Sequence, residues 1–294
     1  MSPLELVKLT ALMGRTSGSP RIRIGLVDGP VAIGLQDLAG ERLKELPGPN
    51  GASCANADSL SCLHGTFVAG ILAGKRGSRA PAICPGCTFL VRPIFAERVS
   101  GHEQMPSATP EVLAEAINDC IAAGARLINL SLGLARPSTL EEQSLQAALD
   151  RAARQGVIVV AAAGNQGTLG STAITRHPWV IPVAACDAHG RPLNESNLGS
   201  SIGRRGLSAP GGDIASFGAD GKMLRLSGTS VAVPFVTGAI ALLWSEFPAA
   251  SAARIKLAIL QSSAPRRASV VPPLLDVAAA HRVMLAQTEM RQSA

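Results

Sequence analysis

The feature that most constrains the fold is a long apolar segment that follows a Gly-Thr-Ser turn. It runs over residues 231–244, directly after Gly228-Thr229-Ser230, and contains no charged side chain. An uninterrupted apolar run of this length is typical of a helix that is buried on all sides. We expect Pro234 in the first turn of this helix, where a missing N–H costs nothing. Ser230 would then lie at the positive end of a buried helix, as either an N-cap or a nucleophile.

The composition favours one α/β domain. The chain has 294 residues, of which 47% are hydrophobic but only 3% aromatic, and it lacks Tyr. Such an interior must be built from Ala, Val, Ile and Leu, which suits helices that cover a parallel sheet. A chain of this length can bury a large core.

Charge and hydropathy argue against nucleic-acid and membrane partners. The net charge is +6, but the arginines are scattered and no aromatic residues interleave with them, so a nucleic-acid surface is not expected. No apolar run approaches the ~18 residues of a membrane span. Residues 1–20 contain Glu5 and lack a basic leader, which is unlike a signal peptide. We therefore expect a soluble, cytoplasmic protein.

Strand-like and helix-like segments alternate along the chain. This alternation predicts a three-layer α/β fold, with a mostly parallel twisted sheet and helices on both faces. Asp28, Ser131 and Asn165 each lie at the end of an expected strand, the edge where sites gather in such sheets. The expected strands are 22–27, 88–94, 126–131, 157–162, 180–185 and 206–209, and the main helices 64–74, 110–123, 139–155, 251–261 and 274–286.

The order of three chemically active residues points to peptide hydrolysis. A hydroxyl must lose its proton as it attacks, a base must take that proton, and donors must stabilise the oxyanion. The chain offers Asp28, His64 and Ser230 in this order, which among Ser-His-Asp enzymes belongs to the subtilisin type. Each residue alone also has a structural explanation: a turn carboxylate, a buried histidine and a helix cap.

Five short motifs together resemble one family. They are Val27-Asp28-Gly29, His64-Gly65-Thr66, the run 129–133 (Asn-Leu-Ser-Leu-Gly), the run 162–165 (Ala-Ala-Gly-Asn) and Gly228-Thr229-Ser230. In this order they resemble the subtilisin-like serine proteases, the subtilases, over residues 21–265. The resemblance implies a peptidase domain over residues 21–294, preceded by a helical extension over residues 1–20.

The resemblance also implies a role for each site residue. Ser230 would be the nucleophile, His64 the general base and then acid, and Asp28 the group that orients His64. Asn165 would donate its amide to the oxyanion, although a turn residue is its structural alternative. A peptide would bind in extended conformation along Ser131, Leu132 and Gly133 as an added strand. Ala162, Ala163 and Gly164 would line the pocket for the side chain before the cleaved bond.

The same resemblance raises the question of a metal. Many secreted relatives hold a tight calcium ion in the loop after the His64 helix. Here that loop, residues 75–80, is basic and has no carboxylate, and Asp37 matches only one ligand position. Calcium needs several oxygen ligands. We therefore expect neither a metal nor another cofactor.

A narrower resemblance concerns the substrate. The run 28–31 (Asp-Gly-Pro-Val) and the cysteines around His64 are similar to the cyanobactin-type maturation proteases, which cut leader peptides from ribosomally made precursors. Alternatives are a general intracellular protease and an inactive subtilase fold that only binds peptides. The sequence does not indicate an oligomeric state.

Four of the six cysteines flank His64 in the sequence. We predict local disulfides, Cys54–Cys62 and Cys84–Cys87, which would hold the neighbouring loops. A four-cysteine zinc site is the alternative, because Cys84 and Cys87 have knuckle spacing. Disulfides would conflict with a reducing cytoplasm. Cys120 and Cys186 lie in apolar segments and are expected to be buried thiols.

Overall fold

The chain is built around a sheet of seven parallel strands. The computed structural model describes residues 1–46, 48, 53–95, 97, 108–132, 142–261 and 269–292, with side chains up to residue 288. The strand order is β2-β3-β1-β4-β5-β6-β7. The strands are β1 (Arg23–Asp28), β2 (Leu43–Glu45), β3 (Thr88–Pro93), β4 (Leu127–Leu130), β5 (Ile158–Ala162), β6 (Val180–Cys186) and β7 (Leu207–Pro210).

The strand order changes direction at β1. The chain places β2 and β3 on one side of β1 and then crosses to build β4 to β7 on the other side. In register, Val27 lies beside Leu130, and Leu130 lies beside Ala161. The ends of β1, β4 and β5 are therefore aligned. The reversal point of a parallel sheet is where ligands bind in open α/β folds.

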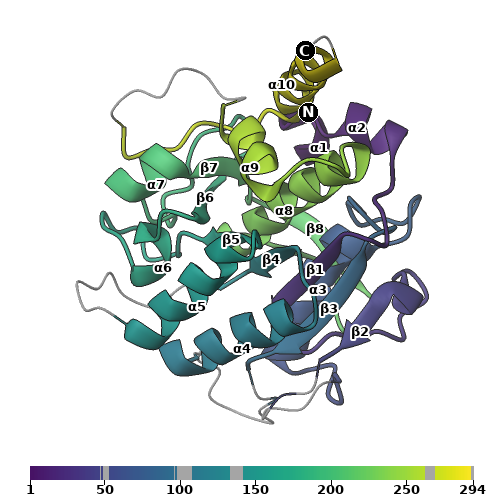
Figure 1. Ribbon diagram of the computed structural model, residues 1–294. Helices are drawn as coiled ribbons and strands as arrows, with labels where there is room; N and C mark the ends of the chain where they lie inside the picture. Colours follow the sequence, from purple (N-terminus) through teal and green to yellow (C-terminus); the bar gives the residue numbers. More distant parts are fainter. Residues whose placement is uncertain are drawn as a thin grey trace.

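Helices cover both faces of the sheet (Figure 1). One face packs against α3 (Leu60–Ala73) and α8 (Thr229–Glu246), and the other against α4 (Pro110–Ala122) and α5 (Gln143–Arg154). Side chains alternate along β1, so that Leu26 joins the α3–α8 core while Val27 joins the α4–α5 core. The predicted three-layer α/β fold is confirmed.

Helix α8 lies at the centre of the molecule. Within the described ranges it is the one helix long and apolar enough to cross a membrane, but 83% of its apolar window is buried in the protein. That burial is typical of a core helix, as the sequence predicts.

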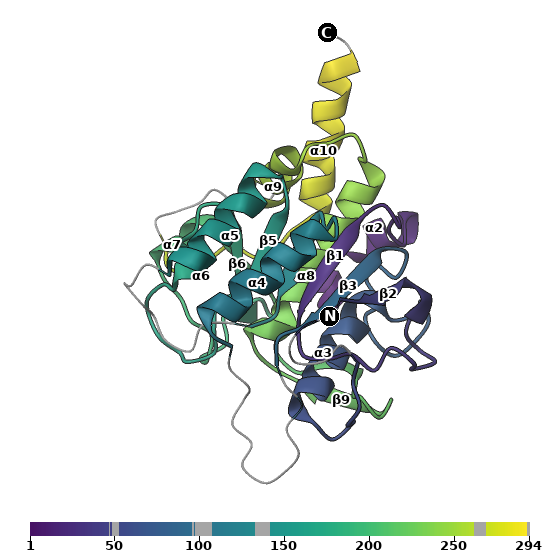
Figure 2. The same cartoon turned by 60° about the horizontal axis from the view of Figure 1, so that its bottom comes forward.

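The remaining helices are short or peripheral. Residues 1–20 contain the short helices α1 and α2, and Val7 and Leu9 from this segment are fully buried in the main core. Helix α10 extends away from the body with the C-terminus at its tip (Figure 2). These elements are α1 (Pro3–Leu6), α2 (Thr10–Arg15), the 3₁₀ turn Gly40–Arg42, α6 (Ala173–Arg176), α7 (Ser200–Arg205), α9 (Ala252–Gln261) and α10 (Val277–Gln292).

Several details differ from the sequence-based expectation. Pro234 is the sixth residue of α8 and lies inside the helix, so its expected place in the first turn is wrong. An antiparallel hairpin of β8 (Ile214–Phe217) and β9 (Met223–Leu226), which leads into α8, was not predicted. Helix α5 begins at Gln143, and residues 139–141 of the expected helix lie outside the described residues.

Candidate active site

Asp28, His64 and Ser230 meet at the edge of the sheet where the strand order reverses. Nδ1 of His64 lies 2.7 Å from Oδ1 of Asp28, and Nε2 lies 3.0 Å from Oγ of Ser230. Asp28 is the last residue of β1, His64 lies in the second turn of α3, and Ser230 is the second residue of α8. The Asp28 side chain is 1% exposed and that of His64 13%. The arrangement leaves the imidazole between a buried carboxylate and a hydroxyl.

The carboxylate fixes which imidazole nitrogen carries the proton. An ionised Asp28 can only accept, so Nδ1 of a neutral His64 donates to it and Nε2 accepts from the Ser230 hydroxyl. Oδ1 of Asp28 also accepts from the N–H of Gly29 at 2.6 Å, which holds the carboxylate in place. Burial disfavours the charged imidazole, but attraction and hydrogen bonding to Asp28 outweigh burial and raise the pKa of His64.

Glycine at position 65 allows α3 to approach β1 closely. A Cβ at Gly65 would collide with the carbonyl oxygens of Gly29 and Pro30. The next residue of the helix, Thr66, accepts a hydrogen bond of 2.9 Å from the N–H of Ala32 through its hydroxyl. These contacts set the separation of Asp28 and His64, because the two side chains project from the segments that touch here.

A chain of buried hydrogen bonds connects α8 to the end of β4. A proline inside a helix leaves the carbonyl four residues earlier without its usual donor, and here Pro234 cannot donate to the carbonyl of Ser230. The hydroxyl of Ser131 donates to that carbonyl at 2.9 Å. Ser131 accepts from Nδ2 of Asn129 at 2.7 Å, and Oδ1 of Asn129 accepts from the Thr237 hydroxyl at 2.8 Å. The backbone of Ser230 is thus fixed to β4.

The side chain of Asn165 is oriented by Thr229. Oδ1 of Asn165 accepts from both the N–H and the hydroxyl of Thr229, each at 2.8 Å. With the oxygen occupied in this way, the amide nitrogen of the exposed Asn165 is available as a donor. The N–H of Ser230 belongs to the first turn of α8 and has no acceptor within the helix. The two donors are close in the fold, because Asn165 is hydrogen-bonded to Thr229, the residue before Ser230.

The other expected substrate residues follow β4 and β5. Ser131 is buried, and its hydroxyl is hydrogen-bonded to the carbonyl of Ser230. Leu132 is half-buried. Ala162 and Ala163 are buried at the end of β5. Gly164 has a φ of 106°, and a Cβ there would collide with the Asn197 amide. Gly133, also expected to bind substrate, lies outside the described residues.

The cysteines form one disulfide and not two. Cys54 and Cys62 are bonded, with their Cα atoms 5.5 Å apart. Cys84 and Cys87 are free, buried thiols, so their expected disulfide is wrong. The apolar surroundings favour the neutral thiol, and burial together with the hydrogen bond to Cys87 raises the pKa of Cys84. Cys54 and Cys62 gather with Glu97 and not with Cys84 and Cys87, so the described residues form no four-cysteine site.

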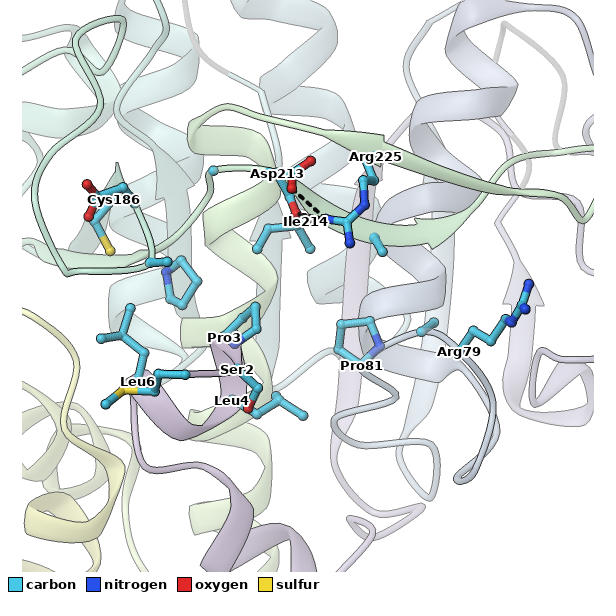
Figure 3. A pocket seen from close by; sticks show the side chains of 17 residues that line it. Ser2, Pro3, Leu4, Leu6, Arg79, Pro81, Cys186, Asp213, Ile214 and Arg225 are labelled. Atoms are coloured by element: carbon cyan, nitrogen blue, oxygen red, sulfur yellow. Dashed lines mark hydrogen bonds and ion pairs between the residues drawn. The ribbon is translucent and has the colours of Figure 1, made fainter.

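A separate cavity of about 330 Å³ lies away from the triad. It is bordered by the N-terminal segment on one side and by the start of the β8–β9 hairpin on the other (Figure 3). Arg225 and Asp213 form an ion pair on its wall. None of the candidate catalytic residues lines it.

Several polar residues that organise the site were not singled out in the sequence. Asn129 and Thr229 appeared only as parts of motifs, and no sequence signal drew attention to Thr237 or Asn197 as supporting residues. The partners of Thr229, Thr237 and Asn197 lie 64, 108 and 31 positions away. Only the folded chain brings these pairs together.

The chain is similar to known proteins over most of its length. The profile of the Subtilase family matches residues 49–282. Subtilisin DY of Bacillus licheniformis is 28% identical over 258 residues, covering 86% of this chain and 87% of that protein. The thermostable alkaline protease of Halalkalibacterium halodurans is 32% identical over 201 residues, covering 68% of this chain and 52% of that protein.

Solved structures superpose on almost the whole chain. A mutant of the protease domain of PatA superposes with a TM-score of 0.86 at 33% identity, covering 94% of this chain and 99% of the other. The prenylagaramide maturation protease PagA superposes with a TM-score of 0.82 at 30% identity, covering 94% and 98%. The chain therefore belongs to the subtilase family and is a subtilisin-type serine endopeptidase.

Proposed function

We propose that this endopeptidase works through Ser230, His64 and Asp28 and an acyl-enzyme intermediate. The observation that carries the proposal is the single imidazole that is hydrogen-bonded to Asp28 at 2.7 Å and to Ser230 at 3.0 Å. Nε2 of His64 takes the hydroxyl proton as Oγ of Ser230 attacks the peptide carbonyl. The same proton then goes to the leaving amine. Water hydrolyses the resulting ester by the reverse sequence of proton transfers.

The negative charge on the former carbonyl oxygen needs donors that are already in position. Nδ2 of Asn165 and the N–H of Ser230 supply them in this proposal. The two hydrogen bonds from Thr229 to Oδ1 of Asn165 support it, because they turn the nitrogen of the amide outward. Preorganised donors of this kind contribute more than flexible ones, since no reorganisation accompanies the reaction.

A peptide substrate would lie extended along the segment that follows β4. Ser131, Leu132 and Gly133 are proposed to pair with its backbone, and Ala162, Ala163 and Gly164 to border the pocket for the side chain before the cleaved bond. Small residues at the end of β5 favour an uncharged pocket. We propose that the protein has no nucleic-acid partner and no membrane partner. We also propose a cytoplasmic location, which cell fractionation would test.

The natural substrate is proposed to be the leader region of a ribosomally made precursor peptide. Support comes from the similarity to PatA and PagA, which extends over 94% of this chain at 30–33% identity. The test is to incubate the protein with precursor peptides that carry a leader and a core, and with unfolded casein, and to identify the products by mass spectrometry. Cleavage at one or two leader sites supports the proposal.

Other results of that experiment would support one of the alternative functions. Digestion of casein at many sites, at the same rate as the precursors, would indicate a general protease. Binding without cleavage by the wild-type protein would indicate an inactive fold. The Ser230→Ala variant controls for contaminating proteases. If Ser230 is the nucleophile, this variant must not form the cleavage products that the wild-type protein forms.

We further propose that the protein needs no calcium. The residues of the loop where relatives hold the ion do not fit a cation: Arg76 donates to the carbonyls of Met13, Thr16 and Ile83 at 2.8–3.2 Å, and Asp37 is exposed. The guanidinium already joins this loop to the N-terminal segment. Chelator should leave the melting temperature unchanged, whereas Arg76→Ala should lower it more than Arg79→Ala in the same loop.

A further inference from the structure

The side chain of Asn197 occupies the centre of the turn that carries Asn165. Asn197 lies in the connection between β6 and α7 and is only 4% exposed. Its Oδ1 accepts from the N–H groups of Gln166 and Thr168, both at 3.0 Å, and from the Thr168 hydroxyl at 3.1 Å. Its Nδ2 donates to the carbonyl of Ala163 at 3.2 Å and to Oε1 of Gln166 at 2.7 Å. The oxygen and the nitrogen of this amide therefore both form hydrogen bonds with the same turn.

These contacts bracket Asn165 without touching it. The backbone N–H of Asn197 also donates to the carbonyl of Gly164 at 2.8 Å, so the turn is held on both sides of Asn165. Asn165 itself is exposed, and its side chain is held by Thr229. Gly164 and Gly167 both have positive φ values, 106° and 63°. A turn with two such residues has many alternative paths unless other groups fix it.

We infer that Asn197 is a positioning residue for the oxyanion donor. It acts through the backbone of the turn and fixes where the Asn165 amide points, while Thr229 fixes which way the amide faces. The inference rests on the proposed oxyanion role of Asn165. No role in binding the substrate is assigned to Asn197, because its polar atoms are directed into the turn.

The size of the effect follows from the chemistry. Loss of one oxyanion donor lowers kcat about 10²–10³-fold, and a misplacement of about 1 Å costs up to about 10²-fold. Asn197→Ala should therefore lower kcat about 10- to 100-fold and leave KM nearly unchanged. Asn194→Ala is the matched control, since Asn194 is three positions away, is exposed, and should leave kcat as in the wild type.

A double-mutant cycle separates positioning from general damage. The rate of hydrolysis of p-nitrophenyl acetate is measured for the wild type, Asn165→Ala, Asn197→Ala and the double variant. If Asn197 acts through Asn165, its substitution costs little once Asn165 is gone, so the double variant is about as fast as Asn165→Ala. An equal loss in both backgrounds, or no loss in the wild-type background, would overturn the inference.

Two further variants keep the test informative if Asn197→Ala folds poorly. Asn197→Asp keeps the acceptor for Gln166 and Thr168 but places an oxygen against the carbonyl of Ala163 and Oε1 of Gln166, so it should lower kcat as Asn197→Ala does. Thr168→Val removes one accepted bond and should lower kcat modestly. A wild-type kcat for both of these variants, in folded protein, would contradict the inference. An unchanged rate for Asn165→Ala would instead contradict the proposed oxyanion role, so the two failures are distinguishable.

Discussion

The hydroxyl of Ser131 donates a hydrogen bond of 2.9 Å to the carbonyl oxygen of Ser230. This bond replaces the helical hydrogen bond that Pro234 cannot make. It belongs to a buried series that continues through Asn129 to Thr237 on the same helix. Ser230, the proposed nucleophile, therefore depends on β4 for its backbone position as well as on α8.

Replacing Ser131 by Ala should weaken both stability and catalysis. The carbonyl of Ser230 and the amide of Asn129 would lose a partner in a buried region, which costs about 1–3 kcal/mol. Ser245→Ala is the matched control, because it also removes a hydroxyl-to-carbonyl bond on α8 but far from the triad. The free energy of unfolding and kcat should both fall for Ser131→Ala alone; equal values for the two variants would contradict the role of the network.

The pH dependence of activity should report the environment of His64. Nε2 must be unprotonated to accept from Ser230, and the pKa of His64 is raised by Asp28. The acid limb of kcat/KM should therefore have its midpoint above the ordinary value of about 6.5. A midpoint at or below that value, or a flat profile between pH 5 and 8, would contradict this assignment.

Asp28→Asn provides the matching experiment on the same histidine. Burial would then act without the opposing carboxylate, so the pKa of His64, followed by NMR, should fall. The variant should also lose about 10⁴-fold in kcat. In the wild type, the raised pKa stabilises the fold most below the unfolded pKa, and this contribution is lost as pH rises through the folded pKa. His64 therefore stabilises the fold most in its inactive, protonated form.

Gly65→Ala should separate α3 from β1. The added methyl group would collide with the carbonyls of Gly29 and Pro30, and overpacking of this kind costs about 1–3 kcal/mol. Because Asp28 and His64 lie on the two segments, kcat should fall together with the melting temperature. Gly14→Ala is the control: a Cβ there meets nothing within 4 Å, so stability should not decrease. Wild-type kcat in Gly65→Ala would argue against this packing.

Thiol counting should find four free cysteines in the unfolded, unreduced protein and six after reduction. In the folded state, reaction should be slow, because burial raises the pKa values of Cys120 and Cys186 to about 12. Two thiols before reduction would mean that Cys84 and Cys87 are bonded. Six would mean that Cys54 and Cys62 are not.

The layers of the fold could be predicted because their signals are local. Alternating apolar segments define strands and helices, and the ends of parallel strands meet at one edge, which places Asp28, Ser131 and Asn165 together. His64 and Ser230 required the family resemblance, since each alone also fits a structural role. The structure brings His64 within hydrogen-bond distance of both Asp28 and Ser230.

The supporting interactions could not be predicted in the same way. The hydroxyl of Ser131 turns inward to Ser230 because of a proline on another element, and the amide of Asn197 fits a turn 31 positions away. The Cys84 and Cys87 pair was misassigned because its spacing suits a disulfide, a metal site and a buried turn equally well. The structure has both as free thiols buried in the core, and the packing of that core is not visible in the spacing.

Labelling with a fluorophosphonate tests the central claim most directly, because this reagent reacts with a serine that an adjacent base activates. Mass spectrometry of the labelled and digested wild-type protein should find one adduct, on Ser230. Ser230→Ala should show none, and His64→Ala should be labelled far more slowly. An unlabelled Ser230 in protein that cleaves peptides, or wild-type cleavage by Ser230→Ala, would contradict the account.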